Sequence, residues 1–300
     1  MRDKPRPLPT KDGVGPSCVA VPAGPWRTLA EFLCQQFPAI DPAVWTARIE
    51  AGEVVDEHGV AVTPQRAFQP GIRLYYYRSL QAEPVLPFDE VVLFQDEHVV
   101  AVDKPHFMPV TPGGRYLQQT LLVRLKRKLG IDTLAPIHRL DRETAGVVLF
   151  SVQPATRGAY QGVFSQRTAT KHYEAIAPWR PELAWPLTRQ SRLEEDEHFM
   201  QMREVPGEPN TETRIEVLKV QGGLALYRLS PITGRKHQLR VHCAALGMPI
   251  VNDLIYPRLM AVDSDDHARP LQLLAKSLEF QDPVTGQHRH FLSQQALALE

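Results

Sequence analysis

The sequence has only three cysteines, Cys18, Cys34 and Cys243, which are far apart. This number and spacing fit neither a disulfide framework nor a zinc site, so we expect free thiols in a reducing cytoplasm. No apolar run approaches the roughly eighteen residues that would span a bilayer. The first residues, rich in proline and charge, also lack the apolar core of a secretory leader. We therefore expect neither a membrane protein nor a secreted one.

The chain also lacks net charge, because 34 Lys and Arg residues balance 34 Asp and Glu residues. A uniformly basic nucleic-acid binder is therefore not indicated. The distribution is uneven, however, with 12 basic against 5 acidic residues between positions 100 and 180, and 5 against 9 between 181 and 220. A local basic surface is typical of contact with a phosphate backbone, and an ordinary mixed surface is the alternative.

Charged and titratable side chains crowd into residues 138–143, with the sequence H-R-L-D-R-E. A Thr-Ala-Gly break follows, and then the short apolar run Val147–Phe150, which predicts a buried strand. A loop that leads into a buried strand can hold a reactive group rigidly and leave it accessible. A surface turn with its charges in water is the alternative.

Two further stretches also contain several charged or titratable side chains. Residues 171–175 read K-H-Y-E-A within a predicted strand, and residues 231–240 read P-I-T-G-R-K-H-Q-L-R. Taken together and in this order, the three stretches resemble the motifs of the RluA-type pseudouridine synthases, over roughly residues 88–291. Residues 249–256 resemble a fourth family motif, with Asn252 in place of glycine. Ala145 and Leu274 also depart from the family pattern, in place of serine and histidine.

The resemblance implies an α+β fold, with a mixed and largely antiparallel central sheet flanked by helices. It implies an RNA uridine isomerase that needs no cofactor and no metal. In the family, one carboxylate close to the sugar acts as nucleophile or base, and Asp141 occupies that position. Arg240 matches the arginine that pairs with this carboxylate and favours its charged form. Tyr173 would contact the uracil and help to move a proton.

Basic and imidazole side chains near these motifs are the candidates for RNA binding. An apolar-faced helix predicted at residues 117–129, closed by Gly130, carries four of the cations. Some of these also suit the helix dipole, and the arginines of the loop could equally form structural salt bridges. The candidates are Arg124, Lys126, Arg127, Lys128, His138, Arg139, Arg142, Lys171, Arg235 and His237.

The periodicity predicts four segments. Residues 1–25 form a flexible arm, 26–80 a small α/β module, 81–87 a linker and 88–300 the catalytic domain. The module, with two helices, a hairpin and a strand, resembles an RNA-binding module of a small-subunit ribosomal protein. A degenerate appendage is the alternative. Within the catalytic domain we expect an irregular excursion or hairpin at residues 180–209. We also expect a helix with Thr233 as N-cap that carries His237 and Arg240 on one face.

Two other functions remain open at this point. A non-catalytic RNA-binding protein is disfavoured by the intact Asp141, Tyr173 and Arg240. A hydrolase that uses Asp141 with His138 or His237 would release uracil or another group instead of forming an isomer. The prediction we adopt is a monomeric RNA pseudouridine synthase that acts on ribosomal or transfer RNA.

Overall fold

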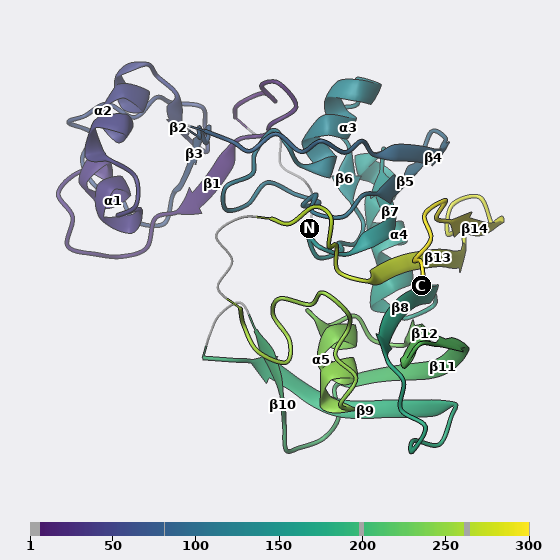
Figure 1. Ribbon diagram of the computed structural model, residues 1–300. Helices are drawn as coiled ribbons and strands as arrows, with labels where there is room; N and C mark the ends of the chain where they lie inside the picture. The colour runs from purple at the N-terminus through teal and green to yellow at the C-terminus, as the bar shows by residue number, and fades with distance from the viewer. Residues whose placement is uncertain (1–6, 81, 198–200, 261–264, 300) are drawn as a thin grey trace. The chain divides into compact units, whose positions relative to one another are not determined.

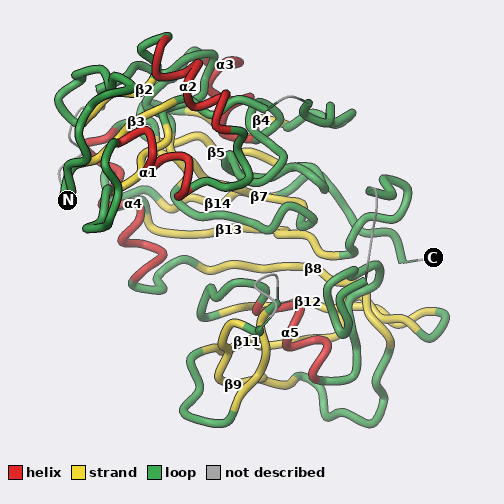
Figure 2. Tube along the Cα trace, turned by 90° about the vertical axis from the view of Figure 1, so that its left-hand side faces the viewer, coloured by secondary structure: helices red, strands yellow, loops and turns green. Residues whose placement is uncertain are grey.

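The computed structural model describes residues 7–80, 82–197, 201–260 and 265–299. It divides into two compact units. Figures 1 and 2 show the helices and strands that make them up. The first unit consists of Met1–Pro84, Pro112–Gln118 and Val123–Asp132, and the second of Val85–Thr111, Gln119–Leu122 and Thr133–Glu300. The sequence analysis had placed the two short segments 112–118 and 123–132 in the catalytic domain, whereas they pack with the first unit.

A small antiparallel sheet in the order β1-β3-β2 and two helices form most of the first unit. Thr28 caps α1 by accepting a hydrogen bond from the Glu31 amide, and Asp41 caps α2 in the same way. Leu29, Phe32 and Trp45 are fully buried between the helices and the sheet. The elements are β1 (Ser17–Ala20), α1 (Leu29–Gln36), α2 (Pro42–Glu50), β2 (Val54–Asp56) and β3 (Arg73–Tyr76).

The predicted flexible arm at residues 1–25 needs correction. Residues 1–6 lie outside the described part of the chain, but β1 pairs along its whole length with β3. Val14 and Val21, on either side of β1, are 6% and 2% exposed. Apolar residues that alternate through this segment therefore make it part of a sheet, although its prolines and glycines concealed the pattern.

Helix α3 (Leu121–Leu129) begins four residues later than predicted. The amides of Leu117 and Gln118 donate to the carboxylate of Glu83, at 2.7 and 2.9 Å, instead of to helical carbonyls. The amide of Leu121 donates to the carbonyl of Pro109. Because these tertiary bonds take up the amides of Leu117, Gln118 and Leu121, the regular helix starts only at Leu121.

The second unit is built on a sheet of eleven strands. The main path runs β10-β9-β11-β12-β8-β13-β7-β5-β4, with β14 paired to β13 and β6 to β7. Among the described pairs, β13 and β7 run parallel and the others antiparallel, which confirms the predicted α+β class with a mixed, largely antiparallel sheet. The elements are β4 (Val91–Gln95), β5 (Val99–Lys104), β6 (Ala135–Pro136), β7 (Ala145–Ser151), α4 (Pro154–Ser165), β8 (Thr170–Pro178), β9 (Leu187–Glu195), β10 (Met202–Val205), β11 (Thr211–Gln221), β12 (Leu224–Pro231), α5 (Gln238–Ala245), β13 (Leu273–Gln281) and β14 (His288–Leu292).

The segment at residues 180–209 is more regular than predicted, because β9 and β10 extend the sheet there. Of the two interpretations offered, the hairpin is therefore confirmed and the irregular excursion is wrong. The acidic run that suggested a solvated loop begins with Glu194 and Glu195, the last two residues of β9, and both are exposed. Residues 198–200 lie outside the described residues.

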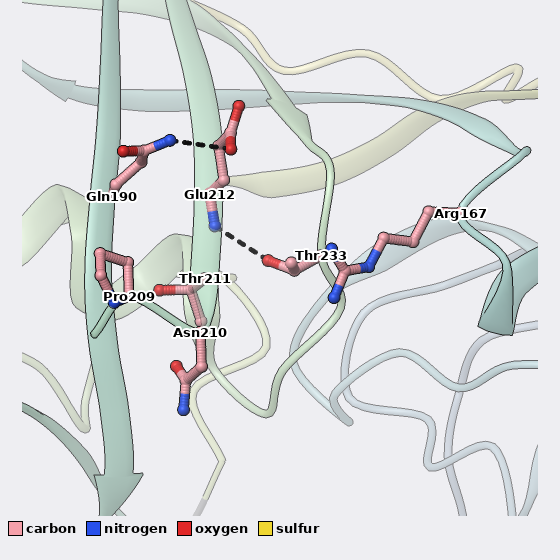
Figure 3. A pocket seen from close by; sticks show the side chains of 7 residues that line it. All are labelled: Arg167, Gln190, Pro209, Asn210, Thr211, Glu212 and Thr233. Carbon is pink, nitrogen blue, oxygen red and sulfur yellow. Dashed lines mark hydrogen bonds between the residues drawn. The ribbon is translucent and has the colours of Figure 1, made fainter. Parts of the chain in front are cut away.

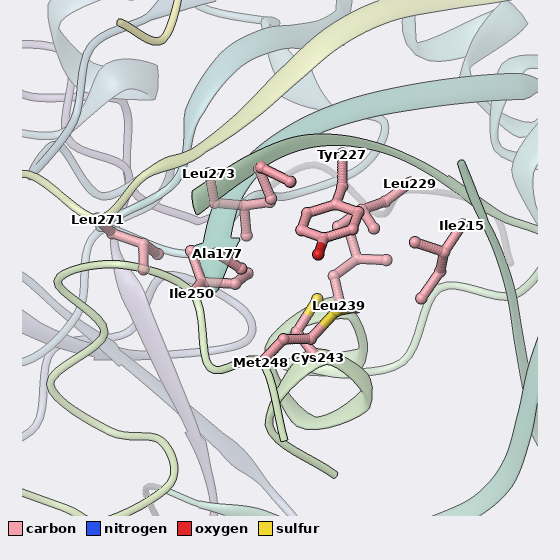
Figure 4. Packing of buried hydrophobic residues seen from close by; sticks show 12 residues of the cluster. Ala177, Ile215, Tyr227, Leu229, Leu239, Cys243, Met248, Ile250, Leu271 and Leu273 are labelled. Atoms are coloured by element: carbon pink, nitrogen blue, oxygen red, sulfur yellow. The ribbon is translucent and has the colours of Figure 1, made fainter. Parts of the chain in front are cut away.

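Helix α5 packs on the sheet through a buried cluster shown in Figure 4. Leu239 and Cys243 point from the helix toward Ile215 of β11 and Tyr227 of β12. Helix α4 packs in a similar way on the part of the sheet around β7, through Tyr160 and Val163. These two clusters fix α5 and β7, the two elements whose ends carry the candidate site.

Within the described chain, no helix is both long and apolar enough to cross a membrane.

Candidate active site

Asp141 lies on the loop that enters β7, and all seven residues of this strand are buried, as predicted. Gly146 has a φ of +111°, and a Cβ at this position would collide with the backbone of Ala275 on the parallel strand β13. Only glycine therefore allows the two strands to approach so closely. The Asp141 side chain is 27% exposed, so the loop presents a partly buried carboxylate that remains accessible from outside.

Lys104, at the end of β5, anchors the backbone of this loop. Its fully buried ammonium group donates to the carbonyls of Pro105, Met108 and Arg142, at 3.0, 2.8 and 3.0 Å. Burial lowers the pKa of Lys104 to about 7, although the nearby charges of Glu143 and Asp141 oppose this change. The lysine thus holds the residue next to Asp141 in place, and each of its three N–H groups donates a hydrogen bond to a carbonyl oxygen.

The side chain of His138 holds the start of the loop in place. Its Nε2 accepts a hydrogen bond from the amide of Leu149 at 3.1 Å, and its ring stacks on Phe164 at 4.6 Å between centroids. Burial lowers the pKa of His138 to about 3, with a smaller contribution from the positive charge of Lys171. This geometry ties the start of the loop to β7 and does not direct the imidazole toward a ligand.

We expect His138 to make folding stability depend on pH. Its pKa lies below that of an unfolded histidine, so between pH 6.5 and about 3 the unfolded chain binds one more proton. Protonation of His138 therefore does not lower the free energy of unfolding above pH 6.5. Below this pH the free energy of unfolding falls, by at most about 1.4 kcal/mol per pH unit for one group. His138→Gln keeps an acceptor for the Leu149 amide but removes the titration. Urea unfolding from pH 7.5 to 5 should thus give a smaller pH dependence for this variant.

The exposed His58 offers a matched control, because His58→Gln should leave the pH dependence of stability as it is in the unmodified chain. Equal slopes for His138→Gln and for the unmodified protein would show that His138 does not carry this pH dependence.

The turn before α5 is fixed by Gln238, which is 3% exposed. Its Oε1 accepts from the Thr233 hydroxyl and the Arg235 amide, and its Nε2 donates to the Glu212 carbonyl and the Thr213 hydroxyl. The prediction of Thr233 as N-cap is wrong, because its hydroxyl bonds to Gln238 and to the Glu212 amide. The helix begins at Gln238 instead, and His237 precedes it with a left-handed φ of +55°.

Arg240 of α5 is 1% exposed and forms a buried ion pair with Asp253. Its Nε and Nη2 donate to the two carboxylate oxygens of Asp253, at 2.8 and 2.7 Å. Burial opposes the positive charge, but these hydrogen bonds raise the pKa of Arg240 above its ordinary value. Two donors of the guanidinium group thus bind Asp253, a partner that the sequence analysis did not name, and the predicted pair with Asp141 is confirmed through the third nitrogen.

The remaining nitrogen of Arg240 faces the loop. Nη1 lies 3.4 Å from Oδ2 of Asp141 and 3.9 Å from Glu143. On the other side of the carboxylate, Nε2 of His237 lies 3.8 Å from Oδ1 of Asp141. Each oxygen of Asp141 therefore has one nitrogen near it, and both nitrogens come from the first turn of α5 or the residue before it.

Tyr173 lies within β8, as predicted, and packs against the buried cluster beneath α5. Burial raises the pKa of Tyr173, and the negative charge of Asp141 raises it further. The phenol therefore keeps its proton at neutral pH. In this state it can donate a hydrogen bond or pack against a base, but it cannot act as a base itself.

The structure divides the predicted RNA-binding residues into several groups. Arg139 and Arg235 are exposed. Arg142 is engaged by the protein, because it forms two hydrogen bonds with Asp265 and one with Glu143. Nζ of Lys171 lies 3.4 Å from the Thr233 carbonyl, and burial lowers the pKa of this lysine.

The four cations of α3 belong to the first unit. Arg127 and Lys128 are exposed and Arg124 is partly buried. Lys126 is only 8% exposed, so the prediction that the polar side of this helix carries all four cations is wrong for this residue. The helix turns residue 126 toward the interior, together with Val123, because the two positions are three apart.

A cavity of about 280 Å³ lies between the end of α4 and the β9–β11 region (Figure 3). Its lining residues are Arg167, Gln190, Pro209, Asn210, Thr211, Glu212 and Thr233. Several of their polar groups already bond to the protein, for example Gln190 to Glu212 and Thr233 to the Glu212 amide. Asp141 does not line this cavity. In the described residues, no three His, Cys, Asp or Glu side chains gather as metal ligands would.

The sequence analysis did not single out Asp253, Tyr256 or Glu143 as site residues. Asp253 and Tyr256 lie in the stretch at residues 249–256, whose motif was noted without a role for its acidic residue. The signal that could have revealed Asp253 is that a buried arginine needs a carboxylate as its partner. Asn252 of the same stretch has a φ of +62°, which explains why asparagine can stand where the family has glycine.

Comparisons with known proteins identify the family of this chain. A family model described as RNA pseudouridylate synthase matches residues 98–245. The dual-specificity RNA pseudouridine synthase RluA of Haemophilus influenzae is 31% identical over 69% of this chain and 94% of its own length. A mitochondrial tRNA pseudouridine(32) synthase of Saccharomyces cerevisiae is 33% identical over 55% of this chain and 36% of that protein.

Among solved structures, human RNA pseudouridylate synthase domain containing 1 has the same fold, with a TM-score of 0.57. It is 23% identical, and the match covers 71% of this chain and 86% of that one. The family match, the RluA-type relatives and the shared fold set aside the hydrolase and the non-catalytic RNA-binding protein. The chain belongs to the RluA-type RNA pseudouridine synthases and is an RNA uridine isomerase.

Proposed function

We propose that this enzyme isomerises specific uridines in loops of ribosomal or transfer RNA, and that Asp141 is its nucleophile or base. The observation that supports this role most directly is the placement of the Asp141 carboxylate. It is 27% exposed, has a nitrogen near each oxygen and stands on a loop fixed by Lys104. A transfer RNA substrate is favoured by the yeast relative, which is a tRNA pseudouridine(32) synthase.

The reaction is an isomerisation, so no atom from outside the uridine has to be added. The N1–C1′ bond of uridine breaks, a C5–C1′ bond forms, C5 loses a proton and N1 gains one. A carboxylate near the sugar can assist bond breaking by attack or by proton removal. Arg240 and His237 would hold that carboxylate, and Tyr173 would contact the base with its protonated phenol. Arg139 and Arg235, which are exposed, would contact the RNA backbone.

The target base must leave its stack to reach a partly buried carboxylate. Extrusion of a base costs a few kcal/mol, and less in a loop than in a duplex, which favours a loop uridine. The release of tritium from RNA that carries [5-³H]uridine would test the activity, because the C5 hydrogen leaves during isomerisation. Pseudouridine mapping in total RNA with and without the gene would then identify the position. Release of free uracil in place of pseudouridine would contradict the proposal.

We also propose that the first unit contributes RNA binding through the exposed cations of α3. Reversal of both charges in Arg127→Glu/Lys128→Glu should weaken RNA affinity, and thermal melting should show that the variant still folds. Each lost phosphate contact should reduce the slope of log affinity against log salt by about 0.7 to 0.9. The measurement is a binding titration of the target RNA at several salt concentrations.

Arg203→Glu/Lys219→Glu provides a control with the same change in charge, because both residues are exposed on strands of the second unit. If both double variants reduce affinity and salt slope equally, the effect comes from net charge, and α3 has no special role.

The division into an RNA-binding unit and a catalytic unit, with the bounds that the structure gives in place of the predicted 26–80, 81–87 and 88–300, belongs to the same proposal. So do a monomeric state and a cytoplasmic location, which the three free cysteines would suit. Light scattering and fractionation would check the last two.

A further inference from the structure

A short hydrogen-bonded chain leads from the protein backbone to Asp141. The amide of Met202 donates to Oη of Tyr256 at 2.7 Å. The same oxygen lies 3.0 Å from Nδ1 of His237, whose Nε2 is 3.8 Å from Asp141. Tyr256 itself is placed by Asp253, which accepts hydrogen bonds from the amides of Ile255 and Tyr256.

The direction of the bond between Tyr256 and His237 follows from proton counting. A backbone amide can only donate, so the Met202 amide occupies a lone pair of the phenol oxygen and leaves its hydrogen available. Tyr256 is 6% exposed, and an unpaired buried hydroxyl is unfavourable. Among the described hydrogen-bond partners of this oxygen, only Nδ1 of His237 can accept. The phenol therefore donates to Nδ1.

The tautomer of His237 then follows. If Nδ1 accepts, the neutral imidazole carries its proton on Nε2, the nitrogen that faces Asp141. The His237 side chain is 9% exposed, and burial lowers its pKa, although Asp141 favours the charged form. Arg240 and Lys236 oppose the charged form, and Glu143 favours it. Burial raises the pKa of Tyr256 to about 12, so the phenol keeps the proton that it donates.

We propose that His237 is a positioning residue for Asp141, held by Tyr256 as the neutral Nε2–H tautomer so that it donates toward the catalytic carboxylate. This inference rests on the proposed role of Asp141. The distance of 3.8 Å is longer than a hydrogen bond, and such contacts tighten when substrate closes a site. With Arg240 near Oδ2 and His237 near Oδ1, rotation of the carboxylate is restricted and its outer lone pairs face the substrate.

The tautomer can be measured without RNA, which separates this inference from the proposed function. Long-range ¹H–¹⁵N spectra of the full chain labelled with ¹⁵N-histidine at pH 7.5 should show His237 with a protonated Nε2 and an unprotonated Nδ1. The His237 signals are assigned by their loss in His237→Gln. Tyr256→Phe should shift them toward a mixture of tautomers. A protonated Nδ1, or an imidazolium, in the unmodified protein would overturn the proposal.

The kinetic test uses two amides of different length. Gln places its NH₂ group near the position of Nε2, whereas Asn places it near Nδ1. We expect His237→Gln to retain kcat within about tenfold, and His237→Asn and His237→Leu to lose about 10- to 100-fold, as misplacement of a reacting group does. KM for the RNA should stay unchanged in all three. If Asn restores more activity than Gln, or if only KM rises, His237 does not position Asp141.

Thermal melting of each variant separates loss of function from loss of folding. His172→Gln is the matched control, because its ring nitrogen bonds to Ser230 within the sheet. It should leave both kcat and the His237 signals unchanged. Activity that survives in Asp141→Asn would refute the proposed function but leave the measured tautomer intact.

Discussion

Asp141→Asn is expected to abolish pseudouridine formation and to leave RNA affinity nearly unchanged. Asparagine has the shape of aspartate, but its amide can neither attack the sugar nor take up a proton as a carboxylate does. Loss of such a group lowers kcat by roughly 10² to 10⁴-fold or more. The partly exposed side chain and the separate anchoring of the loop by Lys104 should preserve folding. Tritium release and a binding titration on the same RNA measure the two quantities.

The matched control is Glu143→Gln, which removes a carboxylate from the same loop. Glu143 pairs with Arg142 and lies 3.9 Å from Arg240, so its loss alters the local charge by the same amount. We expect less than about a tenfold change in kcat, because Gln keeps an oxygen for the Arg142 bond. Equal losses in both variants would show that the charge of the loop matters and that Asp141 has no special chemical role.

The sequence predicted this loop well because its information is local. The apolar run after Gly146 specifies a buried strand, and the charged residues before it have no place in the core. The fold class followed from the family motifs, and the sheet confirms it. Asp141, Tyr173 and Arg240 were named from motif positions, and the structure brings Asp141 and Arg240 to within 3.4 Å of each other.

The errors concern residues whose behaviour depends on distant partners. Threonine is common at N-caps, but the hydroxyl of Thr233 forms hydrogen bonds with Gln238 and with Glu212, which lies in a strand earlier in the chain. The start of α3 depends on a carboxylate more than thirty residues away. No local pattern contains such bonds. The second partner of Arg240 was missed for the same reason, because Asp253 comes to lie beside it only after the chain has folded back.

The fork of Arg240 explains why lysine should not replace it. Nε and Nη2 hold Asp253, and Nη1 is left to face Asp141, so one side chain meets two carboxylates at fixed angles. Lysine carries the same charge on a single nitrogen and cannot keep this geometry. Arg240→Lys should therefore lower kcat while much of the stability remains, as measured by tritium release and urea unfolding.

Arg240→Met should be far more damaging, because it leaves Asp253 buried without its cation. Removal of one partner of a buried ion pair destabilises a protein by about 3 to 5 kcal/mol. Arg240→Met/Asp253→Asn removes both charges, keeps an oxygen for the amides of Ile255 and Tyr256, and should recover much of that free energy of unfolding. It should not recover activity, since neither new side chain can place a cation beside Asp141.

Stability and activity are thus expected to separate in the double variant, and the separation tests what Arg240 does. Urea unfolding gives the free energy, and tritium release from the target RNA gives kcat. The Asp253→Asn single variant completes the cycle and should lose both, because it leaves Arg240 buried without its carboxylate partner. If activity returns with stability in the double variant, Arg240 acts only through folding. If activity stays low in a stable protein, the nitrogen facing Asp141 is needed for the reaction itself.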